Sequence, residues 1–271
     1  MRISWKKYRG KVDVVHGGPP CQPFSTSGRQ NGSKDVRDMV PEFVRAIKEI
    51  SPKAFLMENV PGLNTSKFKD YLDKTLYLPL IQEYEIHKFF IDAASFGVPQ
   101  VRKRLVFIGI SKKVQCNKYT PPTPTHSYSH FSDKQLMLLD LPSRKKCMGV
   151  REALGLTDIG YDNIAPTMRS TFTGPRGTTS ILSSTSAQNT WRKLGIWPNG
   201  VQKEPLVAAN YPAKNGHTRL AVQDCALIQG FPSNWSFTLP VSKTLGLIGN
   251  SVVPVVAYNL ACSIEEALSQ N

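Results

Sequence analysis

The first 110 residues alternate short apolar runs with amphipathic segments, and this alternation restricts the fold more than any other feature. Four apolar runs predict strands: Val12–His16, Ala54–Met57, Ile86–Ile91 and Arg104–Ile110. Two segments with apolar residues on one side predict helices, Asp38–Ile50 and a weaker one over Phe68–Ile81 that breaks near Pro79. Strands that alternate with helices are typical of an α/β sheet. Ligands bind such sheets beyond the carboxyl ends of the strands, where we therefore expect the site residues.

Cys21 stands between prolines on the loop that follows the first predicted strand. Prolines fix φ and remove backbone donors, so the loop loses little entropy when it holds the sulfur in one place. A thiol presented in this way suits a nucleophile. The alternative is a small hydrophobic cysteine in a tight turn, because free cysteines are usually buried. The flanking Gly17-Gly18-Pro19-Pro20 and Gln22-Pro23 favour the nucleophile.

Two further groups of polar residues follow or begin predicted strands. Glu58 comes after Ala54–Met57, and we expect a partly desolvated carboxyl that can hold or donate a proton. The alternative is an exposed acid at a strand end. On an extended segment Gln100, Arg102 and Arg104 share one face, which makes a donor-rich surface for a phosphate or a carbonyl oxygen. The alternative there is a solvated run of charges.

Composition indicates the class of partner. The chain of 271 residues has a net charge of +14 and an isoelectric point near 9.6, which favours nucleic acid, although a basic surface also aids solubility. Residues 111–218 carry a net charge of +8, whereas residues 219–271 are apolar and nearly neutral. Five cysteines without a Cys-x-x-Cys spacing predict neither a disulfide framework nor a zinc ribbon, and we expect no metal site. We expect no signal peptide and no membrane span, hence a cytosolic protein.

Five sequence motifs, in order from residue 17 to residue 254, resemble those of the cytosine-C5 DNA methyltransferases. They are Gly17-Gly18-Pro19-Pro20-Cys21-Gln22-Pro23-Phe24-Ser25, Met57-Glu58-Asn59-Val60, Gln100-Val101-Arg102-Lys103-Arg104, Arg219-Leu220 with Gln229-Gly230-Phe231-Pro232, and Ile248-Gly249-Asn250-Ser251-Val252-Val253-Pro254. Any one motif could arise by chance. The ordered set covers nearly the whole chain and is specific.

The resemblance implies an α/β fold, namely a doubly wound, Rossmann-like methyltransferase sheet with a smaller, irregular and β-rich target-recognition domain. It divides the chain into part of the catalytic domain (1–110), the target-recognition domain (111–218) and a segment that returns to the catalytic domain (219–271). It implies methyl transfer from S-adenosyl-L-methionine to carbon 5 of a flipped cytosine in a specific double-stranded DNA sequence, through a covalent cysteine adduct. The setting would be a restriction-modification system in the bacterial cytoplasm, at the nucleoid. RNA as the substrate is an alternative, which the long basic insert disfavours.

The resemblance also assigns roles to individual residues. Cys21 is the nucleophile, Glu58 the partner of cytosine N3, Arg104 the partner of O2, and Arg102 a contact to loop and phosphate. Cofactor contacts are implied at Pro19, Asn250 and Ser251. Substrate contacts are implied at Gln22, Ser25, Gln100, Arg169, Arg176 and Gln229.

The chain departs from the family pattern at its beginning. The family opens with a Phe-x-Gly-x-Gly turn that approaches the cofactor, but only Met1–His16 precede the Gly-Gly-Pro-Pro-Cys motif, and they contain no such turn. We therefore expect the first strands of the sheet to be missing and Val12–His16 to form an exposed edge. The chain would then be a fragment, a product of a misplaced start codon, or one half of a split enzyme whose complementary subunit carries the glycine-rich turn. A further alternative is a non-catalytic DNA-binding subunit.

Overall fold

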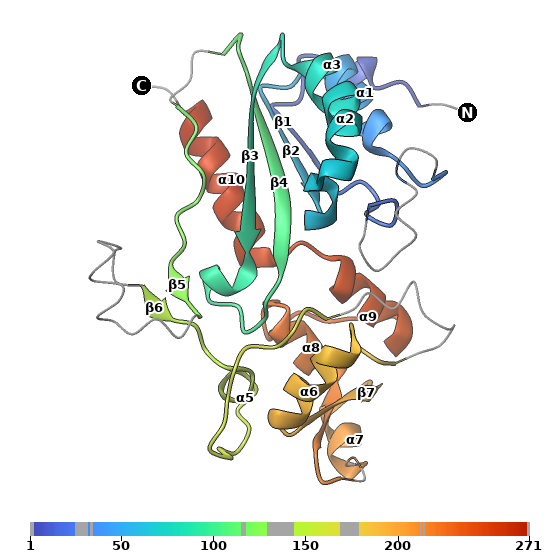
Figure 1. Cartoon of the computed structure of the whole chain (residues 1–271), viewed down its shortest axis with the longest axis vertical. Coiled ribbons are helices and arrows are strands. Elements are labelled where there is room, and N and C mark those ends of the chain that lie inside the picture. The colour runs from blue at the N-terminus through green and yellow to red at the C-terminus, as the bar shows by residue number, and fades with distance from the viewer. Residues whose placement is uncertain are drawn as a thin grey trace. The chain divides into compact units, whose positions relative to one another are not determined.

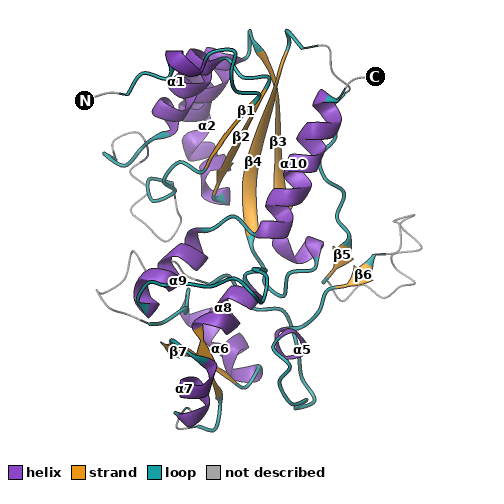
Figure 2. Ribbon diagram, turned by 180° about the vertical axis from the view of Figure 1, so that it is seen from behind, coloured by secondary structure: helices purple, strands orange, loops and turns teal. Residues whose placement is uncertain are grey.

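The computed structural model describes residues 3–24, 32, 35–114, 118–128, 144–168, 179–211, 213 and 215–269 (Figures 1 and 2). The chain forms two compact units, each described here by itself. Unit 1 contains Met1–Ile91, Lys103–Pro122 and Asn259–Asn271, and unit 2 contains Asp92–Arg102 and Thr123–Tyr258. The predicted domain boundaries at residues 110 and 218 were drawn from the positions of the sequence motifs, whereas the two units are defined by contacts within the structure. The predicted domains therefore stay a prediction.

Unit 1 is built on a four-stranded sheet. Its strands, in the order in which they pair, are β1 (Val14–Gly17), β2 (Ala54–Asn59), β4 (Lys103–Ser111) and β3 (Tyr84–Asp92). β1 runs parallel to β2, and β2 runs antiparallel to β4, with Glu58 opposite Val106. Among the described residues β1 pairs with β2 alone, so it forms an edge of the sheet, as predicted. Val14 is 37% exposed there.

The second strand is two residues longer than its apolar run. Glu58 and Asn59 lie inside β2 because their backbones stay paired with β4, at Val106 and Leu105. The prediction that Glu58 follows the strand was therefore wrong in position. The pairing of a strand depends on its backbone, so polar side chains that find partners do not end it.

The helices of unit 1 agree with the apolar pattern. α1 (Val40–Ile50) has Pro41 in its first turn, where a missing N–H costs nothing, and ends at Ser51 with φ of 54°. α2 (Lys69–Leu72) continues into the π-helical segment η5 (Asp73–Tyr77) and then α3 (Leu78–Leu80). Pro79 therefore lies within a continuous helical segment and does not break it. A wider turn before the proline is one way to accommodate its ring and its missing N–H.

Helices cover both faces of this sheet, as in a doubly wound fold (Figures 1 and 2). α1, α2 and α3 lie on one face, where Val44, Ile47 and Leu72 pack with Phe55 and Phe107. The part of α10 (Pro254–Leu268) that belongs to unit 1 lies on the other face and buries Leu260 and Ile264. The described part of this unit also contains the short 3-10 helices η1 (Lys6–Tyr8), η3 (Pro61–Asn64) and η4 (Ser66–Phe68).

Unit 2 is less regular. Its elements are η6 (Ala93–Phe96), β5 (His126–Ser127), β6 (Lys145–Lys146), α5 (Val150–Ala153), α6 (Thr185–Lys193), β7 (Ile196–Gln202), α7 (Pro205–Asn210), β8 (Thr218–Ala221), α8 (Val222–Ile228) and α9 (Val241–Asn250). β5 pairs with β6, and β7 with β8, in two separate two-stranded sheets. The core gathers around the fully buried Trp191, with Cys225 of α8 and Ile248 of α9. Residues 219–258 thus share a core with the predicted recognition segment.

The stretch Val241–Leu268 is long and apolar enough, by length and composition, to cross a membrane. The structure divides it into α9 and α10, which are separated at Ser251–Val253. Leu245 and Ile248 of the first helix and Leu260 and Ile264 of the second are buried in the protein. We therefore interpret both as core helices.

Candidate active site

The loop after β1 presents Cys21 outside the core. The cysteine is half-buried, and its carbonyl accepts a hydrogen bond from the Phe24 N–H at 2.9 Å, which closes a turn. The buried Pro19 is fixed from the next strand, because Asn59 Nδ2 donates to its carbonyl at 3.1 Å. Cys147 differs: it is buried, and burial raises the pKa of its thiol to about 11. The prediction that Cys21 is presented on a loop is confirmed.

An aromatic cluster anchors the far side of this turn. Phe24 is fully buried between the rings of Phe68 and Tyr71, with centroids 5.2 Å away in both cases. The hydroxyl of Tyr71 lies 2.7 Å from both carboxylate oxygens of Asp38, to which it donates. Desolvation, with a contribution from Asp38, raises the pKa of Tyr71, so the phenol remains a donor. Phe24, which closes the turn at Cys21, and Asp38, which comes later in the chain, are thus both held by Tyr71.

Glu58 lies near the carboxyl end of β2. Because β1 runs parallel to β2, the loop that carries Cys21 leaves β1 at the same end of the sheet. Glu58 Oε1 receives Arg104 Nε at 2.6 Å, and both side chains are less than a fifth exposed. Its Oε2 lies against Gly18, where an added Cβ would stand 3.2 Å away. β4 starts beside the end of β2, as Figure 1 shows. Arg104 therefore meets Glu58 diagonally across the pair of strands. The carboxylate therefore has one oxygen held by Arg104 and the other facing the start of the cysteine loop.

Gln100 and Arg102 do not share an accessible face with Arg104, and that prediction was wrong. Gln100 is fully buried in unit 2, where its Nε2 donates to Gln229 Oε1 at 2.8 Å and its Oε1 accepts from the Met168 N–H at 3.0 Å. Arg102 is 2% exposed, and its Nη2 donates to the carbonyls of Gly249 (2.7 Å) and Ser251 (3.0 Å). A buried guanidinium requires such acceptors, and the carbonyls at the end of α9 supply them.

The two predicted cofactor residues of unit 2 lie at this same helix end. Asn250 is the last residue of α9 and is exposed. Ser251 follows it, donates from Oγ to the Ile248 carbonyl at 2.8 Å and accepts from Gln229 Nε2 at its own Oγ (3.2 Å) and carbonyl (3.3 Å). Gln100, Gln229 and Arg102 therefore form one network that fixes the backbone at this turn. The sequence motifs indicated each residue separately but gave no sign of the network.

Of the remaining predicted substrate residues, Ser25, Arg169 and Arg176 lie outside the described residues. Gln22 lies beside Cys21, and its Oε1 is buried with no hydrogen-bond partner among the residues that the structure describes. A buried acceptor without a donor is costly, so this atom is suited to a donor from a bound molecule. Within the described ranges no group of three or more His, Cys, Asp and Glu side chains could hold a metal ion.

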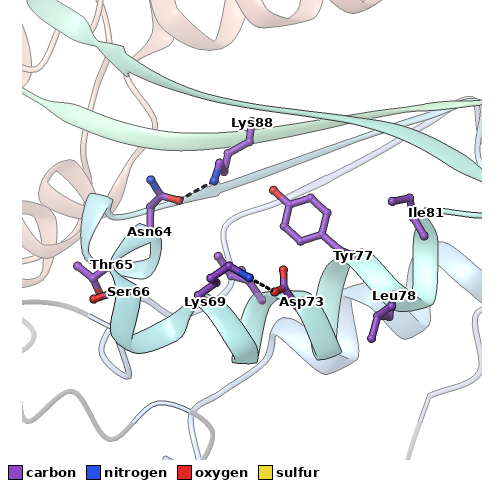
Figure 3. Close-up of a pocket in the computed structure, with 10 residues that line it drawn as sticks. Asn64, Thr65, Ser66, Lys69, Asp73, Tyr77, Leu78, Ile81 and Lys88 are labelled. Carbon is purple, nitrogen blue, oxygen red and sulfur yellow. Dashed lines mark hydrogen bonds and ion pairs between the residues drawn. The ribbon is translucent and has the colours of Figure 1, made fainter.

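A groove of about 880 Å³ in unit 1 was not expected from the sequence (Figure 3). It is lined by Asn64, Thr65, Ser66, Lys69, Leu72, Asp73, Tyr77, Leu78, Ile81 and Lys88. Its charged groups are engaged within the protein, since Lys88 Nζ donates to Asn64 Oδ1 at 2.9 Å and Lys69 Nζ pairs with Asp73 at 2.7 Å. The groove contains none of the predicted site residues, and no periodicity or motif in the sequence could have indicated it.

The fold agrees with what the comparisons with known proteins show. Residues 2–266 match the family described as C-5 cytosine-specific DNA methylase, and the chain belongs to that family. It is a DNA cytosine-5 methyltransferase by membership of the family. The match begins at residue 2, and nothing in the comparisons shows that the cofactor motifs are missing.

Curated relatives are similar over most of their length. The chain is 30% identical over 263 residues to the type II methyltransferase M.NgoMIV of Neisseria gonorrhoeae, covering 96% of this chain and 79% of that protein. It is 32% identical over 290 residues to the type II methyltransferase M.PspPI of Psychrobacter sp. (strain TA137), covering 98% of this chain but 66% of that protein.

Solved structures support the α/β methyltransferase fold. The structure of the methyltransferase EhMeth of Entamoeba histolytica is similar with a TM-score of 0.61 and 16% identity, covering 99% of this chain and 82% of that one. The structure of Dnmt2 of S. pombe is similar with a TM-score of 0.51 and 14% identity, covering 97% and 83%. At these identities the likeness concerns the fold alone.

Proposed function

We propose that Cys21, Glu58 and Arg104 carry out the reaction of the family on a cytosine flipped out of double-stranded DNA. The observation that carries the proposal is the Glu58–Arg104 pair, with one carboxylate oxygen held by Arg104 and the other facing the loop that presents Cys21. The net charge of +14 supports a polyanionic substrate.

The chemistry follows from the weakness of carbon 5 of cytosine as a nucleophile. The Cys21 thiolate adds to carbon 6, and the electron pair of the 5,6 double bond moves toward N3 and O2. Protonated Glu58 gives its proton to N3, and Arg104 donates a hydrogen bond to O2, so charge is stabilised where it develops. The resulting enamine makes carbon 5 nucleophilic. When carbon 5 takes up an electrophile and then loses its original proton, the double bond reforms and the thiolate leaves.

The family implies S-adenosyl-L-methionine as the methyl donor, but the predicted contacts fit it only in part. The carbonyl of Pro19 is occupied by Asn59, and Ser251 uses its polar groups within unit 2. Asn250 alone presents an exposed amide.

We further propose that the remaining contacts to the cofactor come from a segment outside these 271 residues. The absence of a Phe-x-Gly-x-Gly turn in the sequence and the edge position of β1 among the described residues support this. Isothermal calorimetry should show weak binding of S-adenosyl-L-methionine to this chain. Tight, stoichiometric binding would overturn the proposal, and a complementary subunit would then be unnecessary.

The setting that we propose is a bacterial restriction-modification system, with the protein acting in the cytoplasm at the nucleoid. Curated relatives that carry the name type II methyltransferase support this, together with their bacterial sources. The recognised DNA sequence would be read from residues 111–218, where Arg169 and Arg176 are the candidates for base or phosphate contacts.

Hydrogen exchange at carbon 5 tests the site without methyl transfer. Addition of Cys21 lets carbon 5 take up a solvent proton, so DNA with tritium at carbon 5 of cytosine should release tritium into water. Cys21→Ser should abolish the release, and Glu58→Gln should slow it by about 10²- to 10⁴-fold, the usual contribution of a general acid. Cys262→Ser, which changes a half-buried cysteine of α10, is the matched control and should exchange normally. Exchange that persists in Cys21→Ser would refute the proposed roles.

A further inference from the structure

Arg37 is held by Asp35 in a fork geometry near the cysteine loop. Its Nε donates to Asp35 Oδ1 at 2.9 Å and its Nη2 to Oδ2 at 2.7 Å, while its own backbone N–H donates to Oδ1 at 3.0 Å. Such bidentate pairs fix the plane of a guanidinium as well as its position. The Asp35 side chain is 6% exposed and that of Arg37 is 55% exposed, so the remaining edge of the guanidinium is accessible.

A series of hydrogen-bonded turns connects this pair to Cys21. The Gly32 N–H donates to the Pro23 carbonyl at 3.0 Å, and the Asp35 N–H donates to the Gly32 carbonyl at 3.0 Å. Gly32 has φ of 55°, and a Cβ there would lie 2.9 Å from the Phe68 ring, so glycine is required for this close approach. The turn that contains Cys21 and the turn that contains Arg37 are thus joined by backbone bonds.

The aromatic anchor holds the same two turns from the other side. Phe24, three residues after Cys21, packs on Tyr71, and Asp38, next to Arg37, accepts the hydroxyl of Tyr71. Two independent sets of contacts therefore keep Arg37 beside the cysteine loop.

Arg37 brings a positive charge to the neighbourhood of the cysteine loop, next to the negative charge of Asp35. Hydrogen bonding to Asp35 raises the pKa of Arg37, and a smaller contribution comes from the negative charge of Cys21. Among the described residues, Asp35 pairs with Arg37, Glu58 of β2 pairs with Arg104 of β4, and Asp38 accepts from Tyr71 of α2. Among the described residues, Arg37 is thus a cation whose charge interacts with that of Cys21.

We propose that Arg37 is a positioning residue for the reaction, because its charge, oriented by Asp35, stabilises the thiolate of Cys21. The inference rests on the proposed role of Cys21 as the nucleophile and extends it to the group that activates it. Thiolates are the reactive form of cysteine, and a nearby cation increases their population at neutral pH.

Alkylation of Cys21 by iodoacetamide, followed by mass spectrometry of its peptide from pH 5 to pH 10, tests the inference. In Arg37→Gln the rate at pH 7 should fall about three- to tenfold, while the rate at pH 10 should be unchanged, because only the thiolate population differs. Arg37→Lys keeps the charge and should restore most of the rate at pH 7. The control is Arg45→Gln, which removes an arginine of α1 that forms comparable ion pairs with Glu42 and Glu49.

Salt gives a second measurement that needs no variant. Because Arg37 is more than half exposed, 1 M NaCl should screen its charge and slow wild-type alkylation at pH 7, with little effect at pH 10. Identical pH profiles for wild type and Arg37→Gln would overturn the inference. If Arg37→Gln does not fold, a wild-type alkylation rate at pH 7 that does not change with salt would overturn the inference. The assay contains neither DNA nor cofactor, so a negative result leaves the exchange test of Cys21 and Glu58 unaffected.

Discussion

Replacement of Phe24 by leucine should separate the anchoring of the cysteine loop from the general stability of unit 1. Phe24 is fully buried and loses two ring contacts, to Phe68 and Tyr71, each with a centroid distance of 5.2 Å. Each such contact is worth about 0.5–1.5 kcal/mol beyond the buried area, and a roughly volume-conserving swap adds less than about 1.5 kcal/mol. We expect a decrease of about 2–3 kcal/mol in the free energy of unfolding, measured in urea.

The functional cost should be larger than the stability cost suggests. Because Phe24 closes the turn on Cys21, a shift of its ring displaces the thiol, and a displacement of about 1 Å can slow a reaction by about 10²-fold. Tritium release from cytosine carbon 5 should therefore fall at least about tenfold under conditions in which the variant is folded. The N–H of Phe24 remains bonded to the Cys21 carbonyl in either case, so the backbone turn itself is not removed.

Phe107→Leu is the matched control for this experiment. Phe107 is also fully buried in the core of unit 1, but its ring contact is with Tyr77, at 6.3 Å, and not with the cysteine loop. It should lose about 1–2 kcal/mol of stability and keep the exchange rate. Equal exchange rates in the two variants would show that the aromatic anchor serves only folding, and the reasoning would be wrong.

Three further changes test the packing and the polar network. Gly109→Ala in β4 should lower the free energy of unfolding by about 1–3 kcal/mol in urea, because its Cβ would lie 1.9 Å from a ring carbon of Phe55; unchanged stability would contradict this packing. Gln229→Leu leaves the buried amide of Gln100 without its 2.8 Å acceptor and should cost about 1–3 kcal/mol in the free energy of unfolding; unchanged stability would refute the explanation. Burial lowers the pKa of His126, so the folded state favours the neutral ring. The stability that the neutral ring contributes is fully present above the unfolded pKa of about 6.5. It is lost as the pH falls through the lower pKa of the folded state. Wild type should therefore lose more stability than His126→Gln between pH 7.5 and pH 5.5, and parallel losses would exclude His126 as the cause.

Much of unit 1 could be predicted because its signals are local. The apolar face of α1 and the run that begins β2 identify those elements without knowledge of their neighbours, since helix and strand periods differ. The exposure of Cys21 could also be predicted, because the surrounding prolines and glycines restrict the loop from within. The ordered motifs indicated the family, which the match over residues 2–266 confirmed.

The partners of the polar side chains were decided by the tertiary structure. Alternation along residues 100–104 places Gln100, Arg102 and Arg104 on one side of an extended chain, but it does not say whether that side meets solvent or protein. In the folded chain Gln100 and Arg102 bind groups 128 to 149 residues away in unit 2, whereas Arg104 turns to Glu58 on a neighbouring strand. Such pairings form only when distant segments pack together, because a buried guanidinium or amide is stable only where acceptors from other elements surround it.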